Sequence, residues 1–155
     1  MAGPANKDSI IKSLEEYFLK CDMLKDGCLR VDYLGEKPIE YAIEVLPCDP
    51  ILKKYVNGDS VRQYLFAFGS KEFYSQERQQ NIENSAFYER FSEWVEDQND
   101  SGNLPVLPEG MEAEELQVIS SGYLHGESGK HARYQIQLRL KYFKEKKKEA
   151  ENNVS

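Results

Sequence analysis

The chain has 155 residues, of which 40% are hydrophobic, 12% aromatic and 30% charged, with a formal net charge of -7. This length suits a single domain over residues 1–155, and ten Tyr and seven Phe argue against a disordered chain. The negative charge argues against a uniformly basic nucleic-acid binder, and no apolar run approaches the ~20 residues of a membrane helix.

A first helix is predicted over residues 7–24, where apolar side chains recur at helical spacing. Residues 28–33 and 39–45 then alternate between apolar and polar side chains, with a turn sequence between them. This pattern predicts two strands that form an antiparallel hairpin with one solvated face.

The stretch over residues 49–60 contains two features that interrupt regular structure, a proline at position 50 and the tight-turn pair Asn57-Gly58. It is predicted as a short strand or as an arm that projects from the domain. The segment is too short to cover its own apolar side chains, so we expect the arm to contact a neighbouring molecule. These apolar residues are the first part of a candidate interface: Ile51, Leu52, Tyr55 and Val56.

The rest of the chain indicates a buried strand over residues 61–68, a long helix over 80–98, and two strands over 116–123 and 132–143. A polar turn over residues 125–130 joins the last two strands. The final strand shows the strictest alternation of apolar and polar residues in the chain, which is typical of a sheet with one buried face.

This order of elements predicts an α+β domain with a mostly antiparallel sheet and helices packed on one face. The ordered core is expected over residues 7–143, and residues 144–155 form a charged tail. The hydrophobic core should join the two helices over the strands at residues 61–68 and 132–142 through these side chains: Ile10, Leu14, Phe18, Phe87, Phe91 and Trp94.

The sequence carries no phosphate-binding loop, dinucleotide-binding glycine pattern, nucleophile elbow or HExxH zinc motif. His125 and His131 flank the predicted turn, where histidines are usually solvated, and Cys21 lies on the apolar side of the first helix. Three cysteines without a CxxC pair favour a reduced, cytosolic chain. We therefore expect no enzyme activity, no catalytic residue, no cofactor and no metal site.

Charge is distributed unevenly along the chain. Residues 130–148 hold eight basic residues and one acid, whereas the remainder holds twelve basic and 26 acidic residues. This segregation suits a head-to-tail contact in which the basic strand of one copy meets an acidic face of the next. The alternatives are a Lys-rich tail that only solubilises the chain, and a patch that binds nucleic-acid phosphates.

Two groups of charged and polar side chains complete the candidate interface. The outward face of the last strand carries long polar side chains that suit a polar interface or the wall of a lumen: Arg133, Gln135, Gln137, Arg139 and Lys141. The long helix carries an acidic face: Glu83, Glu89, Glu93 and Glu96.

The chain resembles the minor capsid or tail-terminator proteins encoded by phages and prophages of Gram-positive bacteria, which have relatives in phage-tail-like bacteriocins. The resemblance rests on three stretches in order: VDYLGEKPIEYAIEVLPCDPILKKYVNGDSVRQYLFAFGSKEFY, QNIENSAFYERFSEWVEDQNDSGNLP and SSGYLHGESGKHARYQIQLRLKYF. It covers residues 10–143. The chain departs from the family at Val45-Leu46-Pro47, where the family has a Pro-Thr-Pro-like sequence.

The resemblance implies a tail-terminator-like α+β fold and a structural role in the virion. Such proteins close the tail tube with a ring, commonly of six subunits, and present a joining surface to head-completion or neck proteins. Relatives in contractile tails also meet the sheath, and DNA only passes through the lumen. The implied location is the virion tail or neck, and the host cytoplasm before assembly. The family supplies no catalytic residues.

Two alternatives remain open, a head–tail connector of the neck and a soluble interaction module outside any virion. Within the ring, the last strand is either an inter-subunit edge or part of the channel wall. If it is an edge, changing Arg139 and Lys141 together to Glu should block ring formation at low salt. If it lines the channel, rings should still form.

Overall fold

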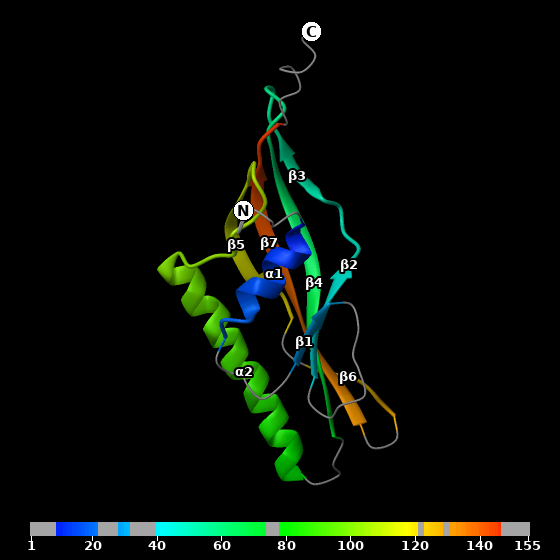
Figure 1. The fold of residues 1–155 in the computed structure, drawn as a ribbon. Coiled ribbons are helices and arrows are strands. Elements are labelled where there is room, and N and C mark those ends of the chain that lie inside the picture. Colours follow the sequence, from blue (N-terminus) through cyan, green and yellow to red (C-terminus); the bar gives the residue numbers. More distant parts are fainter. Residues whose placement is uncertain are drawn as a thin grey trace.

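The computed structural model describes residues 9–21, 28–31, 40–73, 78–120, 123–128 and 131–146, with side chains for residues 9–21, 41–69, 86–120 and 134–146. The helices and strands of these residues follow one another as Figure 1 shows: α1 (Ile10–Phe18), β1 (Cys28–Val31), β2 (Glu40–Leu46), β3 (Ile51–Lys54), β4 (Ser60–Phe73), α2 (Arg78–Ser101), β5 (Met111–Val118), β6 (Tyr123–Ser128) and β7 (His131–Lys144). This arrangement confirms the predicted α+β fold, a mostly antiparallel sheet with helices packed against it.

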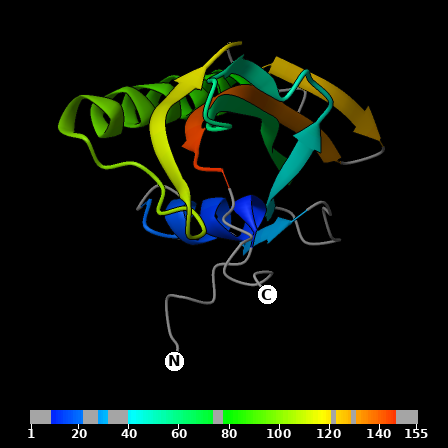
Figure 2. The ribbon, with the colours of Figure 1, turned by 90° about the horizontal axis from the view of Figure 1, so that it is seen from above.

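The strands form one sheet in the order β1-β2-β4-β7-β5, with β3 also paired to β4 and β6 also paired to β7. The long strands β4 and β7 lie at its centre and pair antiparallel from Ser60↔Lys144 to Phe73↔His131. Strands β2 and β3 follow one another along the other side of β4, and β6 and β5 do the same along β7. The two central strands therefore connect the whole sheet, which curves over α1 (Figure 2).

Strands β1 and β2 pair in parallel, from Cys28↔Glu40 to Val31↔Ile43, so the predicted antiparallel hairpin is wrong. Alternation along a strand tells which residues share a face, but it is the same for either strand direction. Eight residues separate the two strands and can reach about 26 Å, twice the roughly 13 Å length of a four-residue strand. The number of residues between the two strands therefore permits a parallel or an antiparallel pair. The direction is known only from the pairing observed in the fold.

The extents of several elements also differ from the prediction. Helix α1 ends at Phe18, and residues 7, 8 and 22–24 of the predicted helix lie outside the described residues. The predicted strand over residues 116–123 is divided between β5 and β6, and β6 continues to Ser128 into the predicted turn. The physical reason is β7, which is 14 residues long and provides pairing partners for both shorter strands.

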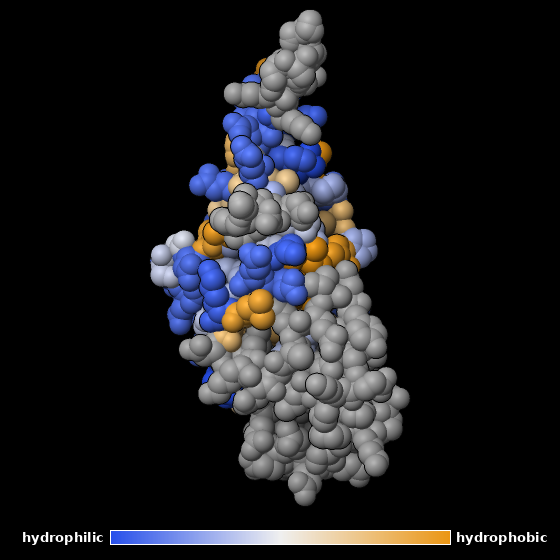
Figure 3. All heavy atoms as spheres, viewed as in Figure 1, coloured by the Kyte–Doolittle hydropathy of each residue, from blue (hydrophilic) through white to orange (hydrophobic). Residues whose placement is uncertain are grey.

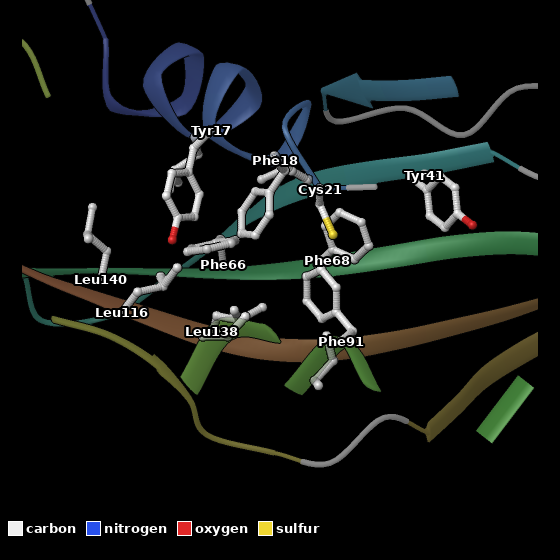
Figure 4. Packing of buried hydrophobic residues seen from close by; sticks show 14 of the residues in the cluster. Tyr17, Phe18, Cys21, Tyr41, Phe66, Phe68, Phe91, Leu116, Leu138 and Leu140 are labelled. Atoms are coloured by element: carbon white, nitrogen blue, oxygen red, sulfur yellow. The ribbon is translucent and has the colours of Figure 1, made fainter. Parts of the chain in front are cut away.

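The hydrophobic core lies between the helices and one face of the sheet, and Phe18 of α1 lies at its centre (Figure 4). Its buried ring lies 5.4 Å from the ring of Phe68 and 5.7 Å from that of Phe91, measured between centroids. Phe68 and Phe91 stack at 4.5 Å. Strand β4 and both helices therefore share one aromatic cluster, as predicted.

The other predicted core residues take their expected places. Leu14 is fully buried, and Ile10, Phe87 and Trp94 pack partly buried against the cluster. Tyr88 is an additional core residue that the prediction did not include. Its ring is buried, and its hydroxyl donates a hydrogen bond to the Tyr134 carbonyl of β7 at 3.1 Å.

Polar contacts fix both ends of α1. The Ser9 hydroxyl accepts a hydrogen bond from the Lys12 amide at 3.2 Å and caps the first turn. Near the other end, the Tyr17 hydroxyl donates to the Asn103 carbonyl at 2.8 Å, which connects α1 to the segment after α2. Burial raises the pKa of the Tyr17 phenol well above its usual range, and the nearby Cys21 adds to this shift.

Candidate functional site

The predicted arm over residues 49–60 is the outer part of an antiparallel hairpin formed by β3 and the start of β4. The Gly58 amide donates to the Tyr55 carbonyl at 2.9 Å, and Gly58 has φ 100°, a backbone conformation that glycine adopts without strain. The Asn57 side chain accepts from the Asp59 amide at 3.0 Å. The Asn57-Gly58 pair therefore forms the predicted tight turn, and the arm contains a strand as well.

The arm belongs to a narrow end of the sheet, which we call the tip (residues 51–62, 110–113 and 142–146) and which extends away from α2 (Figure 1). Hydrogen bonds hold its segments together. The Lys146 amide donates to the Asp59 carboxylate at 2.7 Å, and the Glu145 amide donates to the Gly110 carbonyl at 2.8 Å. The first residues of the predicted charged tail are therefore part of the tip, and residues 147–155 lie outside the described residues.

The apolar side chains of the arm are exposed, as the sequence predicted: Ile51, Leu52, Tyr55 and Val56. Leu52 is 44% exposed and Val56 is fully exposed. The Tyr55 ring contacts Phe143 at 6.5 Å between centroids, and the Lys53 ammonium lies 5.0 Å from its centre. Figure 3 shows mostly hydrophilic side chains on the described part of the tip with few hydrophobic ones among them. The expected contact between the arm and a neighbour remains a prediction.

Strand β7 is not an edge of the sheet, so it cannot be an inter-subunit edge through its backbone, and a contact through its side chains remains a prediction. It pairs with β4 on one side and with β5 and β6 on the other. The charge and alternation of a strand do not reveal its neighbours, because pairing partners come from distant parts of the chain. Only its side chains, and not its backbone, are left to meet a partner.

The polar side chains of β7 lie on the face of the sheet opposite the core, which we call the outer face. Gln135 is only 8% exposed, so it offers little surface to a partner. Gln137 and Lys141 are half-buried, and the Arg139 guanidinium donates to the Gln117 side chain at 2.7 Å. The Arg139 Nε is buried without a hydrogen-bond partner among the described residues. The side chain of Arg133 lies outside the described ones.

The acidic helix face occurs on α2 as predicted, with Glu89, Glu93 and Glu96 exposed at helical spacing. The side chain of Glu83 lies outside the described ones. This acidic surface continues onto β5, where Glu112, Glu114 and Glu115 are exposed, a group that the sequence analysis did not assign to a strand. Glu112 and Glu114 are separated by one residue, the spacing of one face of a strand, so the sequence could have predicted an acidic strand here.

A groove with a volume of about 380 Å³ lies between α2 and β5, lined by these residues: Val95, Glu96, Asn99, Asp100, Glu115, Leu116, Gln117 and Val118. Asn99 closes part of it. Its side-chain oxygen accepts from the Leu116 amide at 2.8 Å, and its side-chain nitrogen donates to the Leu116 carbonyl. Asn99 therefore forms the hydrogen bonds with the Leu116 amide and carbonyl that a neighbouring strand on the side away from β7 would otherwise form.

Within the described part of the chain, no three His, Cys, Asp or Glu side chains form a group that could hold a metal ion. None of the described helices is both long and apolar enough to cross a membrane. Cys21 is buried in the core as expected, and Cys48 is an exposed free thiol. Cys28, His125 and His131 have side chains outside the described ones.

Comparison of the chain with models of known protein families finds no match, and comparison with curated proteins finds none either. The tail-terminator resemblance therefore stands on the sequence pattern alone.

Proposed function

We propose that the protein is a structural component of a phage or phage-tail-like particle. It assembles with copies of itself into a ring, with six subunits as the expected number, that ends the tail tube. The ring offers a joining surface to the head-completion or neck proteins, and a sheath protein is a further partner in a contractile tail. The protein acts by binding and not by catalysis.

The exposed arm carries this proposal. Leu52 and Val56 lie exposed on a projecting hairpin, where none of the described helices covers them. The hydrophobic effect favours removal of such side chains from water, at about 25 cal/mol per Å² of apolar surface. A partner protein that covers the arm would gain this free energy, which supports a role in assembly.

Basic side chains lie on the arm and acidic ones on α2 and β5, and this separation of charge supports a closed ring of identical subunits. A ring formed by rotation repeats one contact between two different patches of each subunit. The arm offers Lys53 and Lys54, whereas α2 and β5 offer exposed acids such as Glu96 and Glu115. Such a pair of unlike patches suits contacts that continue from subunit to subunit.

The outer face of β7 suits the wall of the channel better than a contact between subunits. Arg139 is already engaged by Gln117, and Gln135 is buried within the subunit. We therefore expect that Arg139→Glu with Lys141→Glu leaves rings intact, because β7 contributes no free backbone edge. Sedimentation at low salt measures whether rings form. Loss of the rings would show that the outer face of β7 is part of the contact between subunits.

The test of the proposed function is electron microscopy of particles produced without the protein. Over-long tails or tails not joined to heads are the expected result, and supply of the full chain should restore normal particles. Normal particles in its absence would overturn the proposal and favour an interaction module outside the virion.

A matched pair of variants then tests the arm. The variant with Leu52→Ser and Val56→Ser removes two exposed apolar side chains of the arm, and should fold but fail to restore normal particles. The control with Val106→Ser and Ile119→Ser removes two exposed apolar side chains elsewhere, and should restore them. Equal restoration by both variants would contradict a role of the arm.

A further inference from the structure

The tip presents two strands whose outer edges have no partner strand among the described residues. Strand β3 pairs only with β4, and β5 pairs only with β7, so they lie at opposite sides of the order β3-β4-β7-β5. An open edge presents backbone amide and carbonyl groups that can pair with another strand. All four residues of β3 are exposed.

The two open edges carry opposite charges. Lys53 and Lys54 lie on β3, and Glu112, Glu114 and Glu115 lie on β5, and all five side chains are exposed. Charged residues on an edge strand discourage pairing with a like edge. Pairing of β3 with β3, or of β5 with β5, would bring like charges together, whereas pairing of β3 with β5 brings opposite charges together.

The two edges also lie at the same level of the sheet. The pairings form a row across four strands, from Lys53 to Val61, to Phe143 and to Glu112. Strand β3 runs antiparallel to β4, β4 to β7, and β7 to β5, so β3 and β5 run in opposite directions. Rotation about an axis along the strands preserves their level and direction, so β3 of one copy would meet β5 of the next as an antiparallel neighbour.

The length of the open edge matches as well. Asn99 hydrogen-bonds the backbone amide and carbonyl of Leu116 that point away from β7. The open part of β5 is therefore the stretch that precedes Leu116, residues 111–115. Strand β3 has four residues, which fits this open part. A single chain cannot make the contact within itself, because β4 and β7 separate β3 from β5 by about 14 Å.

We propose that the open edge of β3 in one copy pairs antiparallel with the open edge of β5 in the next copy, with Lys53 and Lys54 against Glu112, Glu114 and Glu115. The occupant of each edge is a second copy of this chain. This inference rests on the proposed ring, for which it supplies the contact between subunits.

Charge reversal tests the pairing on the full chain, by sedimentation velocity over a series of protein concentrations at low salt. Lys53→Glu with Lys54→Glu should raise the concentration of half-maximal association about tenfold, and so should Glu112→Lys with Glu114→Lys. An equimolar mixture of the two variants should associate again, because each reversed edge then meets a complementary one. The matched control, Lys12→Glu with Lys20→Glu, reverses two exposed lysines in α1 and directly after it, away from both edges, and should associate as the unaltered chain does.

Unaltered association of both edge variants would overturn the pairing. Failure of the mixture to associate although both variants fold would overturn it as well. An unaltered chain that stays monomeric at every concentration would also contradict it. Electron microscopy of particles tests the ring's function separately, so edge variants that restore normal tails would refute the pairing and leave the proposed function standing.

A disulfide experiment gives the geometry directly. Lys53→Cys and Glu112→Cys are introduced together in a chain that also carries Cys28→Ser and Cys48→Ser, which leaves only the buried Cys21 of the native cysteines, and the protein is oxidised. A disulfide needs Cα atoms within about 7 Å, so these two cysteines cannot join within one chain. A ladder of linked multimers is the expected result, whereas each single cysteine should give dimers at most. Absence of a ladder under conditions where the unaltered chain associates would contradict the pairing.

Discussion

The part of the sheet covered by the helices and the tip share the strands β4 and β7, but different interactions hold them in place. In the covered part, Phe18 packs against the buried rings of Phe68 on β4 and Phe91 on α2. In the tip, one pair of rings, Tyr55 and Phe143, is supplemented by backbone pairing and a few polar contacts.

This difference separates stability from association. Burial of large side chains provides most of the stabilising free energy of a fold, so the covered part should determine whether the chain folds. The arm (residues 49–60) leaves its apolar side chains exposed, whereas Val61 and Tyr142 of the tip are buried. Substitutions of the exposed apolar side chains of the arm should change what the protein binds and leave its free energy of unfolding nearly constant.

The largest expected effect concerns Phe91 in the covered part. Phe91→Ala removes a fully buried ring that stacks on Phe68, and should lower the free energy of unfolding by about 3–5 kcal/mol. Val56→Ala in the tip should change it by less than about 0.5 kcal/mol. Urea unfolding measures both, and a loss below about 1 kcal/mol for Phe91→Ala would contradict its place in the core.

A smaller effect is expected at Asn99, which lies between the two regions at the edge of β5. Asn99→Ala leaves the amide and carbonyl of Leu116 without their side-chain partner, and should cost about 1–3 kcal/mol. The matched change Asn57→Ala in the exposed turn should cost about 0.5 kcal/mol. Thermal unfolding measures both losses. Equal losses of stability for the two variants would show that the Asn99 hydrogen bonds stabilise the fold no more than those of an exposed turn residue.

The smallest effect concerns the Tyr17 phenol. Tyr17→Phe removes its hydrogen bond to Asn103 and should cost about 0.5–1.5 kcal/mol near neutral pH. Burial raises the pKa of Tyr17 in the folded chain, so folding favours the protonated phenol. Its contribution is complete below pH ~10, the pKa of an unperturbed tyrosine, and is lost as the pH rises further.

The measurement is the free energy of unfolding as a function of pH. The unaltered chain should lose stability more steeply above pH ~10 than Tyr17→Phe does. Burial also raises the pKa of Tyr142, so the variant should retain part of the slope. Identical slopes for both chains would mean that the Tyr17 phenol is not protected from solvent.

Local patterns in the sequence were enough to predict much of this fold. The alternation along residues 132–143 identified β7 and its buried side, and helical spacing placed Phe18 and Phe91 in the core. The turn at Asn57-Gly58 follows from the φ that only a few residue types adopt easily. These features depend on residues close in sequence, so their physical cause is visible without the rest of the chain.

The neighbours of each strand were decided only by the tertiary structure. The parallel direction of β1, the central position of β7 and the open acidic edge of β5 depend on contacts between distant residues. Alternation is the same in an edge strand and a central one, and charge alone does not tell which edge is open. The sequence therefore predicted the exposed arm and the acidic helix, whereas the pairing order turned β3 and β5 into the two open edges of the sheet tip.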